Sequence, residues 1–570
     1  MDAVIGWVRS WSVPARAEGL PHAHGACVTL RCAGRVIGRG SAWADGTLGL
    51  SDTLRSAASA AIAAASDRLP FASDPSLPGR NEEIARQVDI SIELAGPLIP
   101  ITVTKWADAL ALVEPGVDGV ALRLGDKLEA LFPDAMLSNA TEPPAALRSL
   151  LSRLSGDPAL GLKEPRDLGL DPSFYRFRVT HLVQLPGSHE LAYLLRGGVA
   201  PPPLSAAEIG RWASGLAEHL IRRIPDDNST YPGAFNPVLD LAGGGESGTP
   251  AQHALVAFAL QRFARTAASF DAEGARRARA AVLRVLRLFD INHGRSDDLF
   301  AAALLVRTTD ELAPWQGNEE APFLSRLRAR AAGLVSRGTS TVQAVPPGLA
   351  GLVAWATQTA VPAPSGVAPE EPTRSVSLPL IRETFVRTPL VELGGAMPWL
   401  GWAELAARDR LTPETEVPSA EALRQMREMM WAHTLRPESL GHVRLDLAGG
   451  IVFSGTTGVL PTWHAARPLA MVATMLRDPT LTPRESAAIE TARLLAALRY
   501  LRQLSAGAAE GHMYLDPVGA MWGVRGSVWD QRITPEATAT TLLAVCETIE
   551  AVGRRDEGTG GRRDGGEEKK

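Results

Sequence analysis

The chain has 570 residues, of which 45% are hydrophobic and 21% are charged. This length predicts more than one domain, and this composition excludes a chain that is mostly disordered. The formal net charge of −5 argues against a nucleic-acid-binding role that depends on an overall basic surface.

Residues 1–185 are predicted to form a domain of mixed α and β structure. Segments 26–32, 88–94 and 175–183 are short and rich in β-branched or alternating apolar residues, as half-buried strands are. Segment 54–65 is rich in alanine and predicts a helix. Strands separated by helices and long loops indicate a compact α+β unit.

Four short motifs occur in order within this domain: GACVTL at 25–30, DRLP at 67–70, PGVDGV at 115–120 and LFP at 131–133. They resemble the opening strand, the Asp-Arg-Phe-Pro segment, the Pro-Gly-x-Asp-Gly turn and the Leu-Pro loop of the AMMECR family. The resemblance covers most of residues 25–185 and implies an AMMECR-like α+β domain. It also implies a protein partner bound through this domain, because members of the family are associated with radical-SAM and Memo-type proteins.

The sequence departs from the family at the hallmark segment Leu-Arg-Gly-Cys-Ile-Gly. That segment falls on residues 36–41 (VIGRGS), where Gly38 is kept and Arg39 stands in place of the cysteine. Arginine has no accessible nucleophilic form, so chemistry that uses the cysteine is not available here. The substitution favours a diverged binding or scaffold domain over an enzyme.

A proline-rich joint follows, and we place the domain boundary within residues 186–204. Ser205 and Glu208 then form a capping box, which predicts the start of a helix. Residues 205–553 show apolar positions at helical spacing, so this part is predicted to be all-α. The tail, 554–570, consists almost entirely of Gly, Arg, Asp, Glu and Lys and is predicted to be disordered.

The helical part contains an internal repeat. The sequence LDLAGG occurs at 239–244 and again at 445–450, and each copy leads through a Gly/Ser/Thr loop to a Pro-x-x-His-Ala helix start. A weaker third copy begins at residue 516. Repeated units of a loop and a helix pair indicate stacking around an axis.

The helical part resembles an α/α toroid of the kind found in prenyltransferases, terpene cyclases and several polysaccharide-processing enzymes. The resemblance rests on segment 519–544, in which a glycine-rich loop leads to an Ala/Leu-rich helix. It implies an axial pocket, although the sequence has no Asp-x-Asp-Asp cyclase motif. The whole chain is therefore predicted to be multidomain, with an α+β AMMECR-like domain before an all-α helical-repeat toroid.

In a toroid, the loops that enter the inner helices line the axial pocket, so equivalent loop positions are the ligand-binding candidates. Each also has a structural interpretation: the Asp residues can cap their loops, the His residues can pack at helix starts, and Asp530 can pair with Arg525 or Arg532. No catalytic residue is assigned. The candidates are Asp240, Glu246 and His253 from the first copy, Asp446, Trp463 and His464 from the second, and Arg525, Trp529 and Asp530 from the third.

The three cysteines are too few for a disulfide framework and fit a reducing compartment. The chain starts without a secretory signal pattern, and no apolar run reaches the roughly 18–20 residues that cross a bilayer. We therefore expect a cytoplasmic protein that binds neither membrane nor nucleic acid. Because no metal-ligand spacing or cofactor motif is present, no metal site and no cofactor are expected.

These observations leave a binding protein, a scaffold and an enzyme open. The favoured function is a non-catalytic binding or scaffold protein whose helical toroid holds a small polar or carbohydrate-like ligand. The alternative is a toroid enzyme that uses carboxylate and histidine acid–base chemistry on a carbohydrate-like substrate. A carboxylate pair facing an axial cavity would favour the enzyme, whereas a filled interior would favour the scaffold.

Overall fold

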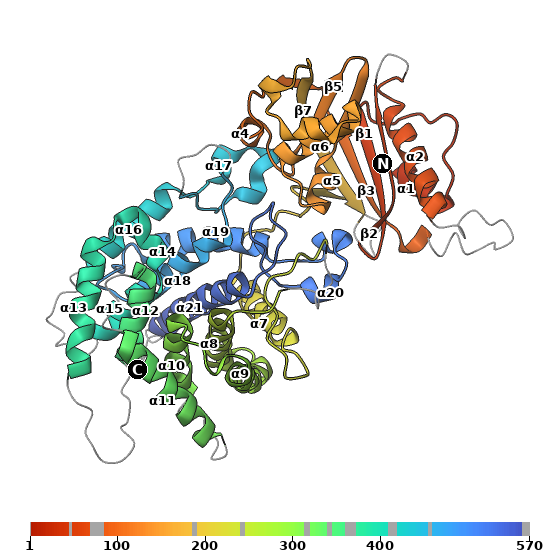
Figure 1. Cartoon of the computed structure of the whole chain (residues 1–570). Helices are drawn as coiled ribbons and strands as arrows, with labels where there is room; N and C mark the ends of the chain where they lie inside the picture. Colours follow the sequence, from red (N-terminus) through yellow and green to blue (C-terminus); the bar gives the residue numbers. More distant parts are fainter. Residues whose placement is uncertain are drawn as a thin grey trace, which may run out of the picture.

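The chain consists of an N-terminal α+β part and a C-terminal part that is mostly helical, as the computed structural model in Figure 1 shows. The predicted order of an α+β region before a helical region is confirmed. The structure describes residues 2–44, 48–68, 85–184, 191–239, 246–312, 320–338, 345–358, 372–408, 419–453 and 459–560.

The strands of the N-terminal part form an antiparallel sheet in the order β2-β1-β3-β7-β5-β6, and β4 and β8 also pair with β7. The long strand β7 pairs with β3 through one half and with β5 through the other. The strands predicted at 26–32, 88–94 and 175–183 are confirmed as β1, β3 and β7. The strands are β1 (Gly25–Cys32), β2 (Arg35–Trp43), β3 (Asp89–Ala95), β4 (Ile99–Ile101), β5 (Asp118–Leu124), β6 (Lys127–Leu131), β7 (Ser173–Gln184) and β8 (Leu191–Leu194).

One face of β1 and β3 is apolar and is covered by α1 (Asp2–Ser10) and α2 (Thr53–Arg68), the second of which contains the predicted helix. Alternate residues of a strand point to opposite faces, and Val28 lies on this side. Strand β2 approaches α2 so closely that a β-carbon at Gly40 would lie 2.3 Å from the carbonyl oxygen of Ala57. The opposite face of β1 and β3 carries polar side chains.

The other half of the sheet has its own helical cover. Helix α6 packs on β5 and β6, and its leucines share a core with Trp106 and Phe174, whose rings meet edge-on at 5.8 Å. The elements here are α4 (Asp108–Leu112), α5 (Pro133–Ser138), α6 (Pro143–Ser155) and the 3₁₀ turns η1 (Pro158–Leu162) and η2 (Pro165–Asp167).

Helices of the C-terminal part alternate between partly exposed and almost fully buried ones. The buried helices α8, α10, α12 and α15 pack on one another in succession, α18 packs on α21, and α21 packs on α8. Helices α15 and α18 are joined by the indole N–H of Trp402, which donates to Thr474 Oγ1 at 2.9 Å. The buried set is α8 (Pro250–Thr266), α10 (Leu299–Leu312), α12 (Pro347–Thr357), α15 (Trp399–Arg408), α18 (Ala466–Met475) and α21 (Pro535–Gly560).

The partly exposed helices lie between them in the sequence and pack on the buried set, as α9 does on α8 and α11 on α10. They are α7 (Ala206–Arg222), α9 (Ala272–His293), α11 (Ala321–Gly338), α13 (Pro372–Arg387), α16 (Ala420–Ala432) and α19 (Ala487–Leu504), with the shorter α14 (Leu390–Ala396), α17 (Pro437–Leu440) and α20 (Pro517–Ala520).

Aromatic side chains fill the interior between α8, α12 and α15. The ring centroids of Trp355 and Trp402 lie 5.1 Å apart, and those of Trp399 and Trp402 lie 5.5 Å apart. Phe258 of α8 meets Trp355 edge-on at 5.8 Å. The guanidinium of Arg262 lies over three of these rings, at 4.9 Å from that of Trp402. Such close packing of rings leaves a filled interior in this part of the helical assembly.

Buried polar contacts join the N-terminal and helical parts. Arg196, which follows β8, donates from Nη1 to both carboxylate oxygens of Asp446 at 2.7 Å, and both side chains are 0% exposed. Arg196 also pairs with Glu114, which receives a second guanidinium from Arg444 at 2.9 Å. Because these contacts link residues far apart in the sequence, they fix the two parts against each other.

Two observations bear on the predicted limits of the helical part. Strand β8 and the buried Arg196 lie within the segment 186–204, so part of the predicted joint is packed. Helix α21 continues to Gly560, past the predicted end at 553. The position of the domain boundary itself stays a prediction.

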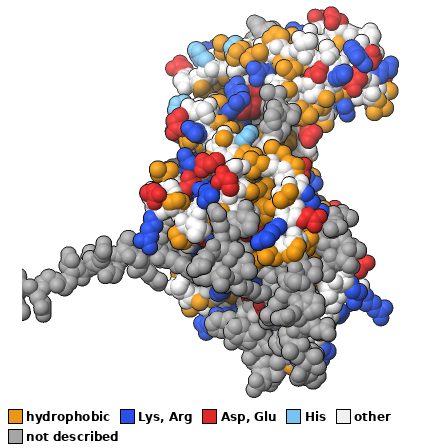
Figure 2. All heavy atoms as spheres, turned by 90° about the vertical axis from the view of Figure 1, so that its left-hand side faces the viewer, with side chains coloured by type: hydrophobic (Ala, Val, Ile, Leu, Met, Phe, Trp, Pro, Cys, Tyr) orange, Lys and Arg blue, Asp and Glu red, His pale blue; other side chains and the backbone are white. Residues whose placement is uncertain are grey.

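The surface mixes charges of both signs. On the face shown in Figure 2, Lys and Arg side chains lie among Asp and Glu side chains. Surface ion pairs such as Arg265–Glu550 at 2.8 Å are part of this pattern. Of the helices that the structure describes, none combines the length and the apolar character that a membrane-crossing helix needs.

Candidate functional site

The candidates from the loop repeats lie in different surroundings. Asp240 lies outside the described residues. Its counterpart Asp446 is fully buried and is held by Arg196, so it joins the two parts of the chain. Glu246 is exposed, and its backbone N–H donates to the carbonyl oxygen of Ala234 at 3.1 Å.

His253, near the start of α8, lies in the packed core. It is 0% exposed, and its ring meets that of His293 edge-on at 4.6 Å and that of Tyr231 at 5.7 Å. Burial, with a smaller contribution from His293, lowers the pKa of His253 to about 4. The imidazole is therefore neutral at neutral pH and serves as a packing group.

His464 occupies the equivalent repeat position in a different environment. It lies in the turn η7 (Trp463–Ala465) before α18, is exposed, and stacks on Trp463 with the centroids 4.2 Å apart. The guanidinium of Arg467 lies 5.3 Å from the Trp463 ring. One repeat histidine is thus a core residue and the other a surface residue, and the structure does not bring them into one pocket.

The third group of candidates is also divided. Arg525 is 1% exposed and donates to the carbonyl oxygen of Leu504 at 3.2 Å. Asp530 pairs with Arg532 at 2.8 Å, which is one of the two pairings that the sequence suggested. Trp529 packs against the core of the N-terminal part. The backbone N–H of Trp463 donates to the carbonyl oxygen of Gly526 at 3.3 Å, so the structure brings the loops of the second and third groups together, whereas His253 and Asp446 are buried.

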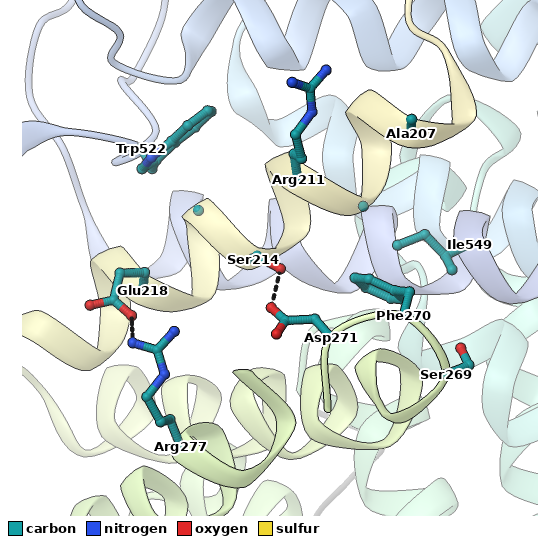
Figure 3. A pocket seen from close by; sticks show the side chains of 12 residues that line it. Ala207, Arg211, Ser214, Glu218, Ser269, Phe270, Asp271, Arg277, Trp522 and Ile549 are labelled. Carbon is teal, nitrogen blue, oxygen red and sulfur yellow. Dashed lines mark hydrogen bonds and ion pairs between the residues drawn. The ribbon is translucent and has the colours of Figure 1, made fainter. Parts of the chain in front are cut away.

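A groove along α7 offers a real cavity instead, with a volume of about 950 Å³ (Figure 3). Phe270, just before α9, and Trp522, in the loop after α20, contribute its aromatic side chains. Arg211, Ser214 and Asp271 contribute polar groups between and beside these rings. The groove thus combines apolar and hydrogen-bonding surface, as small-molecule sites do.

The two faces of α7 explain how the groove forms. The apolar face of α7, which includes Trp212 and Leu216, is buried. The groove side carries small residues that let the aromatic rings come close. A β-carbon at Gly215 would lie 2.4 Å from the indole of Trp522, and one at Gly210 would lie 3.5 Å from the ring of Phe270.

Trp522 is held in an uncommon conformation. Its φ of +69° lies in the left-handed region, which a bulky side chain rarely adopts. Its backbone N–H donates to the carbonyl oxygen of Ala506 at 2.9 Å, and the guanidinium of Arg502 lies 4.8 Å from its ring. Strained residues of this kind concentrate at binding and catalytic sites, where the surrounding structure holds them.

The carboxylates of the groove are already bonded. Ser214 Oγ donates to Asp271 at 2.6 Å, and Asp271 also accepts from the backbone N–H of Gly274 at 2.8 Å. These bonds, the one from Ser214 first, lower the pKa of Asp271. Glu218 pairs with Arg277 at 2.9 Å. An ionised, bonded carboxylate accepts hydrogen bonds from a ligand well and is poorly suited to act as a general acid.

Arg211 contributes an exposed cation to the groove. It is exposed, and the described part of the chain gives its guanidinium no hydrogen bond or ion pair. In Figure 3 its side chain extends from α7 on the side of Trp522. A guanidinium in this position can donate several hydrogen bonds to a hydroxylated or anionic ligand.

No groove residue was among the predicted candidates. The available signal was the set of small residues Ala207, Gly210, Ser214 and Gly215 on one side of α7, where a surface helix usually carries more long polar side chains. The partners Phe270 and Trp522 come from distant segments, so their approach depends on the tertiary fold. Over the residues that the structure describes, no group of three or more metal-ligating side chains is present.

Comparison with known proteins gives little information. No family model and no curated protein sequence matches the chain. Among solved structures, the chain is similar to an uncharacterized protein, PH0010 from Pyrococcus horikoshii, with 15% sequence identity and a TM-score of 0.25. That match covers 34% of this chain and 91% of the other. A similarity at this level assigns neither a fold nor a function.

Proposed function

We propose that the protein is a non-catalytic binding protein whose helical part holds a small carbohydrate-like ligand in the groove along α7. The observation that carries the proposal is the pairing of two aromatic rings, Trp522 and Phe270, with the hydrogen-bonding groups of Arg211, Ser214 and Asp271 in one open groove. Aromatic rings stack on the apolar faces of sugar rings, while planar polar side chains bind the hydroxyl groups.

We further propose that the buried helices form an α/α toroid. The proposal is supported by the alternation of buried and partly exposed helices and by the return of α21 to α8. The aromatic interior supports a binding or scaffold function over the toroid enzyme, because packed rings occupy the space that a substrate would need. In the groove, Asp271 is hydrogen-bonded to Ser214 and Glu218 is paired with Arg277. These bonds also support a binding function over an enzyme.

We also propose that residues 1–185 form an AMMECR-like domain that binds a protein partner in the cytoplasm. The support is the order of the four motifs, of which GACVTL lies in β1 and PGVDGV runs into β5. Arg39, which stands at the position of the hallmark cysteine, lies on β2 opposite Thr29 of β1. A binding or scaffold role for this domain agrees with an arginine at that position.

Saccharide binding tests the proposal for the groove. We expect cellobiose or chitobiose to raise the melting temperature of the full chain, because a ligand that binds only the folded state stabilises it. Trp522→Ala should weaken the binding by up to about tenfold, since an aromatic stacking contact contributes about 0.5–1.5 kcal/mol. Differential scanning fluorimetry and isothermal titration calorimetry measure the two effects.

Tyr193→Ala is the matched control for this experiment. It removes an aromatic ring that is 42% exposed and lies on β8, outside the groove, so it should bind the saccharide as the wild type does. The proposal is wrong if a panel of neutral, N-acetylated and acidic saccharides leaves the melting temperature unchanged. It is also wrong if Trp522→Ala binds as tightly as the wild type.

A further inference from the structure

A second group of buried polar side chains lies on the face of the sheet opposite α1 and α2. Strand alternation places Thr29 and Arg31 of β1 on this side, and Ser91 and Glu93 of β3 beside them. Each of these four side chains is at most 2% exposed. A buried sheet face is usually apolar, so a polar one needs a specific reason.

The cover of this face comes from both parts of the chain. Asp134 belongs to α5 of the N-terminal part, whereas His512 belongs to the turn η8 (Glu510–Met513) of the helical part, and each is 1% exposed. At Gly34, beside β1, a β-carbon would lie 2.0 Å from the carbonyl oxygen of Tyr514, so the two parts meet closely here. We call the residues Arg31, Arg39, Glu93, Asp134, His181 and His512 the junction cluster.

Part of the bonding capacity of the junction cluster is used internally. Arg31 Nη2 donates to both carboxylate oxygens of Asp134, at 2.9 and 2.8 Å, and Arg39 Nη2 donates to one of them at 3.1 Å. Glu93 Oε1 accepts from the backbone N–H of Asp134 at 2.8 Å. His181 Nε2 is bonded to the hydroxyl of Ser91 at 2.7 Å.

Other hydrogen-bonding atoms of the junction cluster have no partner among the described residues. Four buried atoms of the cluster have no hydrogen-bond partner: Arg31 Nη1, Glu93 Oε2, His181 Nδ1 and His512 Nε2. They come from β1, β3, β7 and η8, so the two parts of the chain both contribute. A single buried polar atom without a partner costs about 1–3 kcal/mol, so a molecule that bonds to four of them in one cluster is stabilised there.

The protonation states show what kind of groups these atoms present. Burial and the neighbouring charge of Asp134 raise the pKa of Glu93, which favours its protonated form; because Oε1 accepts from Asp134, the proton is favoured on Oε2. Burial lowers the pKa of His512 to about 3. The Nδ1–H of this neutral ring donates to the carbonyl oxygen of Ala509 at 2.7 Å, which leaves Nε2 as an acceptor.

The cluster therefore offers Arg31 Nη1 as a donor, Glu93 Oε2 as a second donor in the protonated form that its surroundings favour, and His512 Nε2 as an acceptor. His181 Nδ1 is a third donor when the Ser91 hydroxyl donates to Nε2, and a second acceptor when it does not. The guanidinium groups of Arg31 and Arg39 outnumber the one ionised carboxylate, because the two arginines hold the pKa of Asp134 low even though burial alone would raise it. An excess positive charge and several donors favour a small anion with several acceptor oxygens.

We propose that the junction cluster is a binding site for a small oxyanion that also bears a hydroxyl group, held between the N-terminal and helical parts. The oxygens of the anion accept from Arg31 and Glu93, and its hydroxyl donates to His512 Nε2. Hydrogen phosphate and short hydroxycarboxylates have this chemistry. The site is separate from the groove along α7 and takes a different class of ligand.

Arg39 marks the entrance of this site. Its side chain is 28% exposed, whereas those of Arg31 and Asp134 are 1% exposed. It is anchored by Asp134 and by Thr29, whose hydroxyl oxygen accepts from Nε at 3.0 Å. An anion that approaches from solvent meets this guanidinium first.

The test uses the full chain at constant ionic strength with inorganic phosphate, glycolate, acetate and chloride as probes. Phosphate and glycolate are expected to raise the melting temperature more than chloride, and glycolate more than acetate, because acetate lacks the hydroxyl group. Arg39→Gln should weaken phosphate binding at least about tenfold, since it removes one of the two positive charges of the junction cluster. His512→Phe should abolish the preference for glycolate over acetate.

Arg276→Gln is the control for anions bound at surface arginines, because Arg276 is 74% exposed and pairs only with Glu273 among the described residues. This variant should keep the phosphate response of the wild type. The proposal is overturned if no oxyanion stabilises the protein more than chloride does, or if Arg39→Gln binds phosphate as the wild type does. If His512→Phe does not fold, the phosphate affinity of Arg39→Gln alone tests the proposal. Neither outcome changes the expected saccharide binding in the groove along α7.

Discussion

Arg196→Met is expected to lower the free energy of unfolding by about 3–5 kcal/mol, because it leaves the buried carboxylate of Asp446 without its cation. In the structure the guanidinium donates to both oxygens of Asp446 at 2.7 Å, and neither side chain is exposed. Methionine keeps the aliphatic part of the side chain, so the lost charge dominates over a cavity. Urea denaturation at neutral pH, followed by circular dichroism and tryptophan fluorescence, measures the change.

The matched control is Arg444→Met at the same junction. Arg444 also pairs with a carboxylate, that of Glu114, but it is 51% exposed, so its loss should cost less than about 1 kcal/mol. The double variant Arg196→Met/Asp446→Leu should recover most of the stability, since no unpaired charge remains buried. A loss below about 1 kcal/mol for Arg196→Met alone would mean that this ion pair does not hold the two parts together.

Local patterns in the sequence predicted three of the eight described strands, helix α2 and the start of helix α7. The capping box at Ser205 is present, with each of Ser205 and Glu208 accepting from the backbone N–H of the other. The strands β1, β3 and β7 and the helix α2 lie where alternation and alanine content placed them. These features depend on residues that are neighbours in the sequence, so the sequence alone contains the information.

The surroundings of the site candidates depend on contacts between distant segments. Asp446 lies before a Gly-rich turn in a repeated motif, which suggested a pocket residue or a loop cap, yet its partner Arg196 lies 250 positions away. The groove likewise joins Trp522 to Gly215 of α7. Ion pairs and cavities between distant segments depend on how the helices and the sheet pack, and residue spacing does not report this.

Lowering the pH from 7 to 5 is expected to remove about 2 kcal/mol of the stability that depends on His219. Burial, reinforced by the charges of Arg223 and Arg222, lowers the pKa of His219 to about 3 in the folded protein. In the unfolded chain the pKa is near the ordinary value of about 6.5. Below about pH 6.5 the unfolded chain binds a proton that the folded protein does not. The stabilisation that depends on His219 is therefore fully present above about pH 6.5 and is lost as the pH falls.

His219→Gln isolates this contribution in urea denaturation at both pH values. Carboxyl groups with a raised pKa, such as Glu93 and Asp89, the latter at about 6, bind protons in the folded protein over the same range and oppose the effect. The total change is therefore a sum of both signs, but the difference between wild type and variant reports His219 alone. We expect the variant to lose about 2 kcal/mol less than the wild type, since each pH unit is worth about 1.36 kcal/mol per proton.

His442→Gln, which replaces an exposed histidine, should behave as the wild type does. Equal losses in the wild type and in His219→Gln would mean that the folded protein admits the proton, and that burial does not keep this imidazole neutral.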